Sequence, residues 1–323
     1  MERVVALLAA ILAAAGLAAC GNGAEPGAPR GATLVLDFQP NAAHTGVYAA
    51  LHEGYYRDAG LDLHVQEPSA STDAPKLLEA GRAQFAILDI HDLAIAREHG
   101  LDVVGVMPIV QVPLAAVIAR DRAEVRTPAD LAGKTVGVTG LPSDDAVLDS
   151  VLASSGVEPS SVHRVTIGFN AVADLRAGKL DAATAFWNAE GVALRRQGVP
   201  TREFRVDRYG APRYPELILC TTGALSRSDP ALVSSVRGAT TKGYRLAAHD
   251  PGRALSDLLA ETNGLDPAEQ RSELRALDAA NAFRGVGRFR SAPLIRWSSW
   301  EVAHGIVDRR PSLRAFGLPP AGG

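Results

Sequence analysis

Four groups of polar and aromatic residues follow apolar runs, at positions where a strand-to-helix turn needs only a cap. The first group lies in LDFQPNAAHTG, where Asp37, Phe38, Asn41 and His44 occur close together. Acids and an imidazole can exchange hydrogen bonds with a bound molecule, and a phenyl ring can stack on a flat one. This turn is therefore interpreted as one wall of a small-molecule pocket.

The first group also has purely structural interpretations. Asn41 can be the N-cap of the following helix, with His44 in its first turn, and Phe38 can belong to the core. The cap explains Asn41 well and His44 poorly, because a protonated imidazole at a helix N-terminus opposes the helix dipole. We therefore expect His44 to contact the ligand.

The other groups occupy equivalent places after later apolar runs. Asp89 follows FAIL, Ser143 lies in GLPSDD, and Trp187 and Glu190 lie in AFWNAEG. Ser143 can simply cap a helix, and Trp187 can equally be a core residue. Asp89 is expected to be partly buried, so its carboxylate needs hydrogen-bond donors or a cation. All four are candidate ligand contacts.

The charged residues at these strand ends are all acidic. Asp37, Asp89, Asp144, Glu190 and Glu216 accept hydrogen bonds when ionised, and no arginine or lysine stands among them. A carboxylate, sulfonate or phosphate ligand would call for a bidentate arginine. The set therefore predicts a flat, neutral or weakly basic ring that carries amino groups.

Motifs for bond chemistry are missing. The sequence has no Gly-x-Ser-x-Gly elbow, no phosphate-binding P-loop and no His-Glu-x-x-His pair. The net charge of −3 gives no basic surface of the kind that binds nucleic acid. We therefore expect no enzyme activity, no cofactor, no metal site and no nucleic-acid partner.

Apolar strand patterns alternate with helical ones from residue 32 onward, which favours largely parallel sheets with helices on both faces. The alternation of strand and helix patterns begins again at PLAAVIAR. The chain is expected to cross from one lobe to the other at this run and to cross back at ELILCTT. The sequence predicts an α/β protein of two hinged lobes. Lobe I is expected to contain residues 32–113 and 217–323, and lobe II residues 114–216.

The N-terminal segment has a different composition. Residues 1–19 contain one arginine and then an apolar run too short for a comfortable membrane span, as in a signal peptide. The run ends in LAAC, which resembles a bacterial lipobox, so Cys20 is predicted to be lipid-modified. Residues 20–31 are expected to form a flexible tether. Cys220 then remains alone and is expected to be a small buried residue.

A family resemblance follows from several of these segments. LDFQPNAAHTGVYAALHEGYYRDAGLDLHV resembles the opening of the substrate-binding proteins of ABC importers for thiamine pyrimidine precursors. It is equally similar to the eukaryotic enzyme that makes hydroxymethylpyrimidine phosphate. TPADLAGKTVGV, LRAGKLDAATAFWNAEGV and VDRYGAPRYPELIL continue the match over most of residues 33–222. TPADLAGKTVGV is also shared with taurine, sulfonate and nitrate binders.

The resemblance implies a type-two periplasmic-binding-protein fold, whose lobes close on the ligand. It implies a monomeric, lipid-anchored receptor on the extracytoplasmic face of the membrane, which delivers a pyrimidine to an ABC permease and its ATPase. Phe38 stands where the family usually has tryptophan. The residues expected to bind the ligand are Asp37, Phe38, Asn41, His44, Tyr48, Asp89, Ser143, Trp187, Glu190, Tyr214 and Glu216. Phe38 and Trp187 are expected to sandwich the ring.

Three alternatives stay open. The ligand can be another heteroaromatic compound such as riboflavin, because such binders share the scaffold. The protein can be a synthase-like enzyme, although the synthase it resembles carries a cysteine-rich iron-binding motif, which is missing here. A surface interaction protein would need a large exposed apolar patch.

Overall fold

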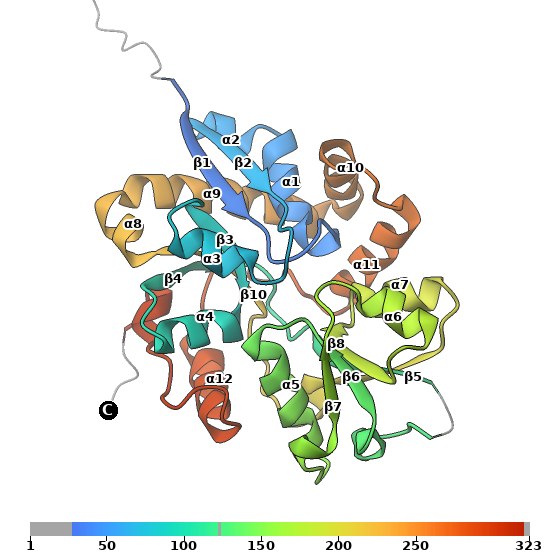
Figure 1. Cartoon of the computed structure of the whole chain (residues 1–323). Coiled ribbons are helices and arrows are strands. Elements are labelled where there is room, and N and C mark those ends of the chain that lie inside the picture. Colours follow the sequence, from blue (N-terminus) through green and yellow to red (C-terminus); the bar gives the residue numbers. More distant parts are fainter. Residues whose placement is uncertain (1–27, 122–123, 320–323) are drawn as a thin grey trace, which may run out of the picture.

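The computed structural model describes residues 28–121 and 124–319, in which two five-stranded sheets form separate lobes (Figure 1). The first sheet contains, in spatial order, β2 (Leu61–Gln66), β1 (Arg30–Val35), β3 (Phe85–Asp89), β10 (Leu217–Thr222) and β4 (Val103–Pro108). The second contains β7 (His163–Thr166), β6 (Thr135–Val138), β8 (Ala182–Phe186), β5 (Ala115–Arg120) and β9 (Thr201–Arg205). The two-lobed α/β architecture predicted from the sequence is confirmed. Its boundaries at 113/114 and 216/217 stay predictions.

Each sheet is largely parallel, as predicted from the sequence, with a single strand that runs against the other four. In the first sheet β10 runs antiparallel to β3 and β4, and in the second β5 runs antiparallel to β8 and β9. Both β5 and β10 follow a crossing from the other lobe. They therefore enter their sheets from the cleft, whereas β1, β3, β6 and β8 end there.

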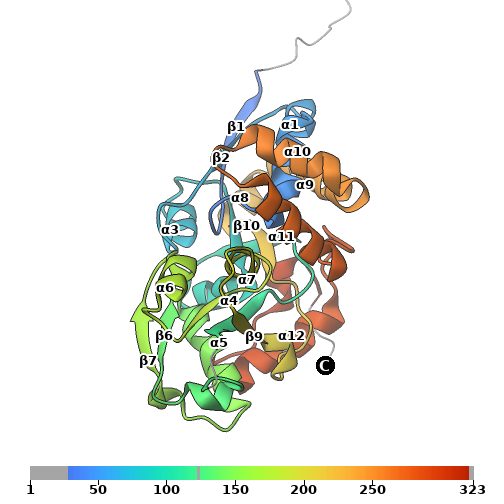
Figure 2. The same cartoon turned by 90° about the vertical axis from the view of Figure 1, so that its right-hand side faces the viewer.

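Most helices belong to the first lobe. These are α1 (Thr45–His52), α2 (Tyr55–Asp58), α3 (Asp73–Glu79), α4 (Ile90–Glu98), α8 (Gly223–Ser228), α9 (Pro230–His249), α10 (Pro251–Glu261), α11 (Pro267–Ala279) and α12 (Ser291–Ala303). The second lobe has α5 (Pro142–Ala153), α6 (Ala171–Ala177) and α7 (Glu190–Arg196). Helix α11 contacts α7 across the lobes, and Figure 2 shows this side of the molecule. No helix of the described residues is long and apolar enough to span a membrane.

Two N-terminal predictions need adjustment. Strand β1 already begins at Arg30, which pairs with Leu61, so the last two residues of the predicted tether belong to the sheet. The continuous helix expected after the first turn is broken into α1 and α2, because Gly54 adopts φ 74° between them. The predicted signal peptide and Cys20 lie outside the described residues.

The core of the first lobe depends on close helix packing. Helix α1 crosses α9 where Gly46 faces Tyr244 and Gly243 faces the backbone of α1. Cys220 is fully buried in β10, as expected for a small apolar residue. The packing of α1 matters for function because this helix begins directly after the turn that contains Asp37 and His44.

Candidate ligand-binding site

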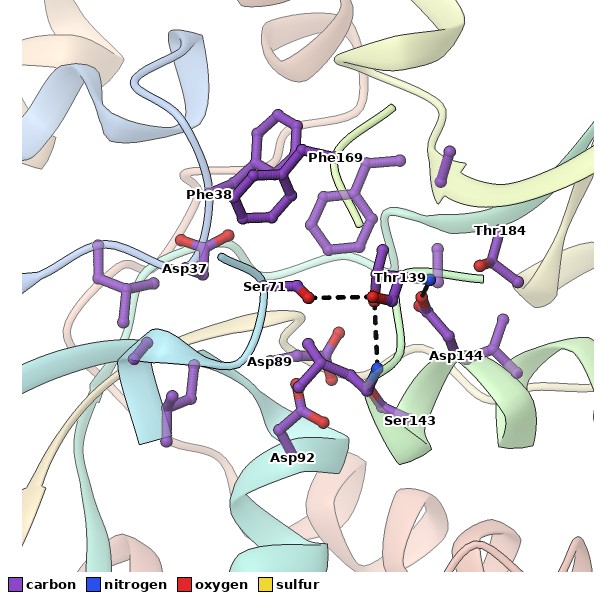
Figure 3. Close-up of a pocket in the computed structure, with 18 of the residues that line it drawn as sticks. Asp37, Phe38, Ser71, Asp89, Asp92, Thr139, Ser143, Asp144, Phe169 and Thr184 are labelled. Carbon is purple, nitrogen blue, oxygen red and sulfur yellow. Dashed lines mark hydrogen bonds between the residues drawn. The ribbon is translucent and has the colours of Figure 1, made fainter. Parts of the chain in front are cut away.

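A cavity of about 800 Å³, part of it open to solvent, lies between the lobes at the carboxyl ends of β1, β3, β6 and β8 (Figure 3). Ligands in open α/β sheets bind at this position. The first lobe contributes Asp37, Phe38, Ser71, Ala74, Pro75, Ile87, Leu88, Asp89 and Asp92. The second contributes Ala115, Ala116, Thr139, Leu141, Ser143, Asp144, Val147, Phe169, Thr184, Ala185, Phe186 and Glu190. No lysine or arginine lines this cavity among the described residues.

The turn after β1 forms one wall of the cavity through a hydrogen-bonded relay. The backbone N–H of Asn41 donates to His44 Nδ1 at 3.2 Å, so the neutral ring carries its proton on Nε2. That nitrogen donates to Asp37 Oδ1 at 2.9 Å. His44 is fully buried, whereas Asp37 lines the cavity. The histidine therefore fixes the Asp37 carboxylate and leaves its second oxygen for a ligand.

Asn41 is the residue that starts this turn. Its side chain accepts a hydrogen bond from the N–H of Ala43 at 2.8 Å and caps the 3₁₀ turn η1 (Ala42–His44). The side chain of His44 completes a capping box with the Asn41 backbone. Both residues thus act on the cavity through Asp37.

Aromatic rings from both lobes border the same space. Phe38 and Phe169 meet edge to face, with ring centroids 4.7 Å apart and an interplanar angle of 80°. The side chain of Phe186 lines the cavity from β8. These rings can enclose a flat ligand between apolar faces.

Polar contacts also join the lobes across the cavity. The hydroxyl of Ser71 donates to the carbonyl of Thr139 at 3.0 Å (Figure 3). Asp92, in the first turn of α4, and Ser143, at the start of α5, line the cavity from the two lobes. The structure therefore shows the lobes in contact around the site.

Burial raises the pKa of several carboxyl groups in the cavity. The pKa of Glu190 is raised to about 7, although the N–H of Phe186 donates to its Oε2 at 3.1 Å. Burial likewise raises the pKa of Asp144, which accepts the N–H of Thr139 at 2.6 Å. Carboxyl groups that titrate near neutrality can either donate or accept a hydrogen bond. Together they suit a ligand with both amino groups and ring nitrogens.

The structure brings five of the predicted binding residues to the cavity: Asp37, Phe38, Asp89, Ser143 and Glu190. Asn41 and His44 lie behind it, in the relay described above. Tyr48 is buried in α1, within the hydrophobic core of the first lobe. The remaining three, Trp187, Tyr214 and Glu216, are buried outside the cavity lining.

Trp187 is held by contacts of its own. Its indole N–H donates to the carbonyl of Pro113 at 3.0 Å, and the guanidinium of Arg205 lies 4.0 Å from the ring centroid. Trp187 follows the last residue of β8, in the turn before α7, and its buried side chain does not line the cavity, whereas Phe186 does. The structure directs Phe186 to the cavity and Trp187 to the crossing between the lobes.

Tyr214 and Glu216 lie beneath the floor of the cavity. Glu216 Oε2 accepts hydrogen bonds from the backbone N–H groups of Leu114 and Ala115, where the crossing that contains Pro113 enters β5. The ring of Tyr214 stacks on Trp300 with an interplanar angle of 27°. Both residues are thus part of the hinge region.

Sequence reasoning missed several lining residues. The rule about strand ends could have found Phe169, which follows VTIG, the end of β7 and the two residues after it. Ser71 and Thr184 carry no such signal, because Ser71 lies in a loop and Thr184 within a strand. Asp92, in the first turn of α4, also lines the cavity.

The fold and site define a class of protein: two α/β lobes that close around a small-molecule cavity. The alkanesulfonate-binding protein SsuA from Xanthomonas axonopodis pv. citri superposes with a TM-score of 0.71 at 19% identity, covering 87% of this chain and 96% of that one. This similarity confirms the periplasmic-binding-protein fold.

Sequence comparison places the chain within a particular family. Residues 41–254 match the family model described as NMT1/THI5 like, and the chain belongs to this family. A formylaminopyrimidine-binding protein from Halalkalibacterium halodurans is 32% identical over 260 residues, which span 80% of this chain and 78% of that protein. The 4-amino-5-hydroxymethyl-2-methylpyrimidine phosphate synthase THI5 of Saccharomyces cerevisiae is 23% identical, over 70% of each chain. The family resemblance seen in the sequence is confirmed, and the family includes both a binding protein and synthases.

Proposed function

We propose that this protein is the solute-binding receptor of an ABC importer for a pyrimidine precursor of thiamine, of the hydroxymethylpyrimidine or formylaminopyrimidine type. The observation that carries the proposal is the composition of the cavity, where five carboxyl groups and three phenylalanines occur without a cation. An aminopyrimidine offers amino donors, ring-nitrogen acceptors and a flat face, which match this lining.

In this role the ring lies among Phe38, Phe169 and Phe186. Asp37, oriented by His44, accepts from an amino group, and Glu190 exchanges a hydrogen bond with a ring nitrogen. Trp187 acts by holding the crossing segment near Pro113. A sulfonate would meet buried carboxylates and no arginine, so the ligand differs in charge class from that of the structural neighbour.

The protein acts by binding and release in this proposal, in contrast to its relatives that are named synthases. Cys220 carries the only thiol of the described residues and is buried in β10, and no lysine lines the cavity. We further propose lipid attachment at Cys20, which would hold a monomeric receptor at the extracytoplasmic membrane surface beside its permease.

Calorimetric titration of the chain from residue 21 onward tests the ligand. The titrants are 4-amino-5-hydroxymethyl-2-methylpyrimidine and its formylated aminomethyl analogue, with taurine as the sulfonate control. We expect a Kd of about 1 μM or below, about −8 kcal/mol, for at least one pyrimidine and no binding of taurine. Taurine binding, or heat with riboflavin alone, would overturn the assignment.

Site variants separate the cavity from its surroundings. Glu190→Gln and Phe169→Ala should each weaken binding about tenfold or more, because one hydrogen bond or one ring face is lost. The matched control is Val165→Ala, on the exposed side of β7 in the same lobe, which should bind normally. Unchanged affinity in both cavity variants would place the ligand elsewhere.

A further inference from the structure

Beneath the floor of the ligand cavity, three segments bring buried acids and a histidine together. Potential ligand atoms of Asp89, His91 and Glu216 all lie within 4.8 Å of one another. Asp89 ends β3, His91 is in the first turn of α4, and Glu216 immediately precedes β10. No sequence pattern predicted metal ligands here, because the second lobe lies between these residues in the sequence: Asp89 and His91 come before it and Glu216 comes at its end.

The hydrogen bonds around His91 prepare one ring nitrogen for a ligand. Its Nδ1 contacts a carboxylate oxygen of Glu301, which is fully buried on α12, while the indole nitrogen of Trp297 lies farther away, at 3.4 Å. The Nδ1 proton is therefore donated to Glu301, and Nε2 has no partner in the structure. A carboxylate that holds one ring nitrogen while the other binds a metal is a recurrent arrangement in metal sites.

Other buried polar atoms at the same place also have no partner. Glu216 uses Oε2 for two backbone N–H groups, but its Oε1 is unpaired, and so is the hydroxyl of Tyr214. The ring of Tyr214 packs edge-on against His91, with centroids 4.9 Å apart. A buried polar atom without a partner costs about 1–3 kcal/mol, so the unpaired atoms of His91 and Glu216, two residues of one buried cluster, indicate a bound species.

The cluster also has an excess of negative charge. Asp89, Asp92, Glu216 and Glu301 surround a single histidine. Among the described residues no lysine or arginine forms an ion pair with these acids.

We propose that Asp89, His91 and Glu216 bind a divalent first-row transition metal ion such as Zn²⁺. Mixed imidazole and carboxylate donors suit zinc and its neighbours rather than Mg²⁺ or Ca²⁺, which prefer oxygen ligands alone. Ligand atoms about 2.1 Å from a tetrahedral zinc ion are about 3.4 Å apart, so small carboxyl rotations complete the site. Glu301 orients His91.

The position of this ion gives it a structural role at the hinge. Asp89 also lines the ligand cavity, and Glu216 is bonded to the start of β5. A bound ion would therefore connect the floor of the cavity to the crossing between the lobes. It would also stabilise the folded chain by mass action.

The test is titration of the chelator-treated chain with Zn²⁺, in the absence of any pyrimidine. We expect one ion per chain and a Co²⁺ derivative with the visible absorption of a low-symmetry site. His91→Gln should weaken binding more than about 100-fold, and Glu301→Gln about 10–100-fold, the usual effect of a residue that orients a ligand. The matched control is His52→Gln, since His52 forms a surface cluster with Asp257 and Glu261 that could hold zinc adventitiously.

Anomalous scattering at the zinc edge from crystals of the unaltered protein locates the ion even if a variant does not fold. An anomalous peak at His91 supports the proposal. Three results would overturn it: no stoichiometric binding, loss of binding in His52→Gln alone, or an infrared band of a protonated carboxyl group that persists at saturating zinc. The last would show that protons, not a metal, neutralise Asp89 and Glu216. None of these results depends on which pyrimidine binds.

Discussion

His44 illustrates how a buried residue can control a binding site that it does not touch. Its ring accepts the N–H of Asn41 and donates to Asp37, so both nitrogens are used. We expect His44→Leu to destabilise the fold by about 1–3 kcal/mol, because the buried N–H loses its acceptor. The released carboxylate should also weaken pyrimidine binding about tenfold, or about 1.4 kcal/mol. Urea unfolding and calorimetry measure the two effects.

The control for this variant is His64→Ala, on the exposed side of β2. It should leave both quantities unchanged. If His44→Leu lost stability but kept full affinity, the relay to Asp37 would have no part in binding.

Glu190 provides a second test at the same scale, through pH. Its pKa in the folded state is raised to about 7 by burial, so the folded protein holds this proton more tightly than the unfolded chain does. The resulting stability is complete below about pH 4.5 and is lost as pH rises through 7. Glu190→Gln should therefore gain stability relative to the unaltered chain between pH 5 and 8, by at most about 3 kcal/mol and less if water enters the cavity.

Denaturant unfolding of the ligand-free protein at several pH values measures this difference. Glu158→Gln is the matched control, since Glu158 is exposed on the same lobe. Parallel stability curves for Glu190→Gln and the unaltered chain would contradict a raised pKa.

The limits of sequence reasoning are clearest for single residues. The strand-end rule placed Asp37, Asp89 and Glu190 well, because the carboxyl end of a strand is fixed by its apolar pattern. The rule selected Trp187, whereas the structure lines the cavity with Phe186, the residue before it. Where β8 ends depends on its pairing with β5, which lies far away in the sequence.

At the scale of elements, α1 and α9 depend on two glycines for their close approach. A methyl group on Gly243 would lie 1.9 Å from the carbonyl oxygen of Gly46. Gly243→Ala should therefore destabilise the protein by about 1–3 kcal/mol through overpacking, and should disturb the turn that precedes α1. Thermal unfolding and pyrimidine titration measure these effects.

Gly238, on the exposed side of the same helix, is the matched control. Beyond its own helix backbone, no described atom lies within 4 Å of the position that a methyl group would occupy there. Gly238→Ala should instead stabilise the protein by about 0.5–1 kcal/mol, since alanine has less conformational freedom than glycine to lose when the chain folds. Equal effects of the two substitutions would show that helix propensity alone matters here.

Elements were easier to predict than their directions. Apolar runs such as FAILD and LILCTT identify buried strands whatever their partners. TREFR, which forms the edge strand β9, contains no such run, because its polar residues are typical of an edge. The antiparallel direction of β5 and β10 is a property of the lobe crossings, which local patterns do not encode.

At the scale of the whole molecule, binding is expected to be coupled to closure of the lobes. Ser71 donates to Thr139 and Phe38 meets Phe169, so each contact joins one lobe to the other. A ligand shifts the protein toward the closed form only as far as it binds that form more tightly. Contacts between the lobes and contacts with the ligand therefore contribute to the same equilibrium.

Ser71→Ala tests this coupling, because it removes one hydrogen bond between the lobes and no aromatic contact with the ligand. The loss of a hydrogen bond worth about 0.5–1.5 kcal/mol should weaken pyrimidine binding about 2- to 10-fold. Small-angle X-ray scattering should show a larger radius of gyration for the ligand-free variant and a normal value at saturation. Because the closed form of the variant is less populated before binding, its apparent affinity for the pyrimidine should fall in proportion.

The matched control is Ser69→Ala. Ser69 lies in the same loop but is hydrogen-bonded to Asp73 within its own lobe, so this variant should leave the radius unchanged. A larger radius together with unchanged affinity in Ser71→Ala would separate closure from ligand binding.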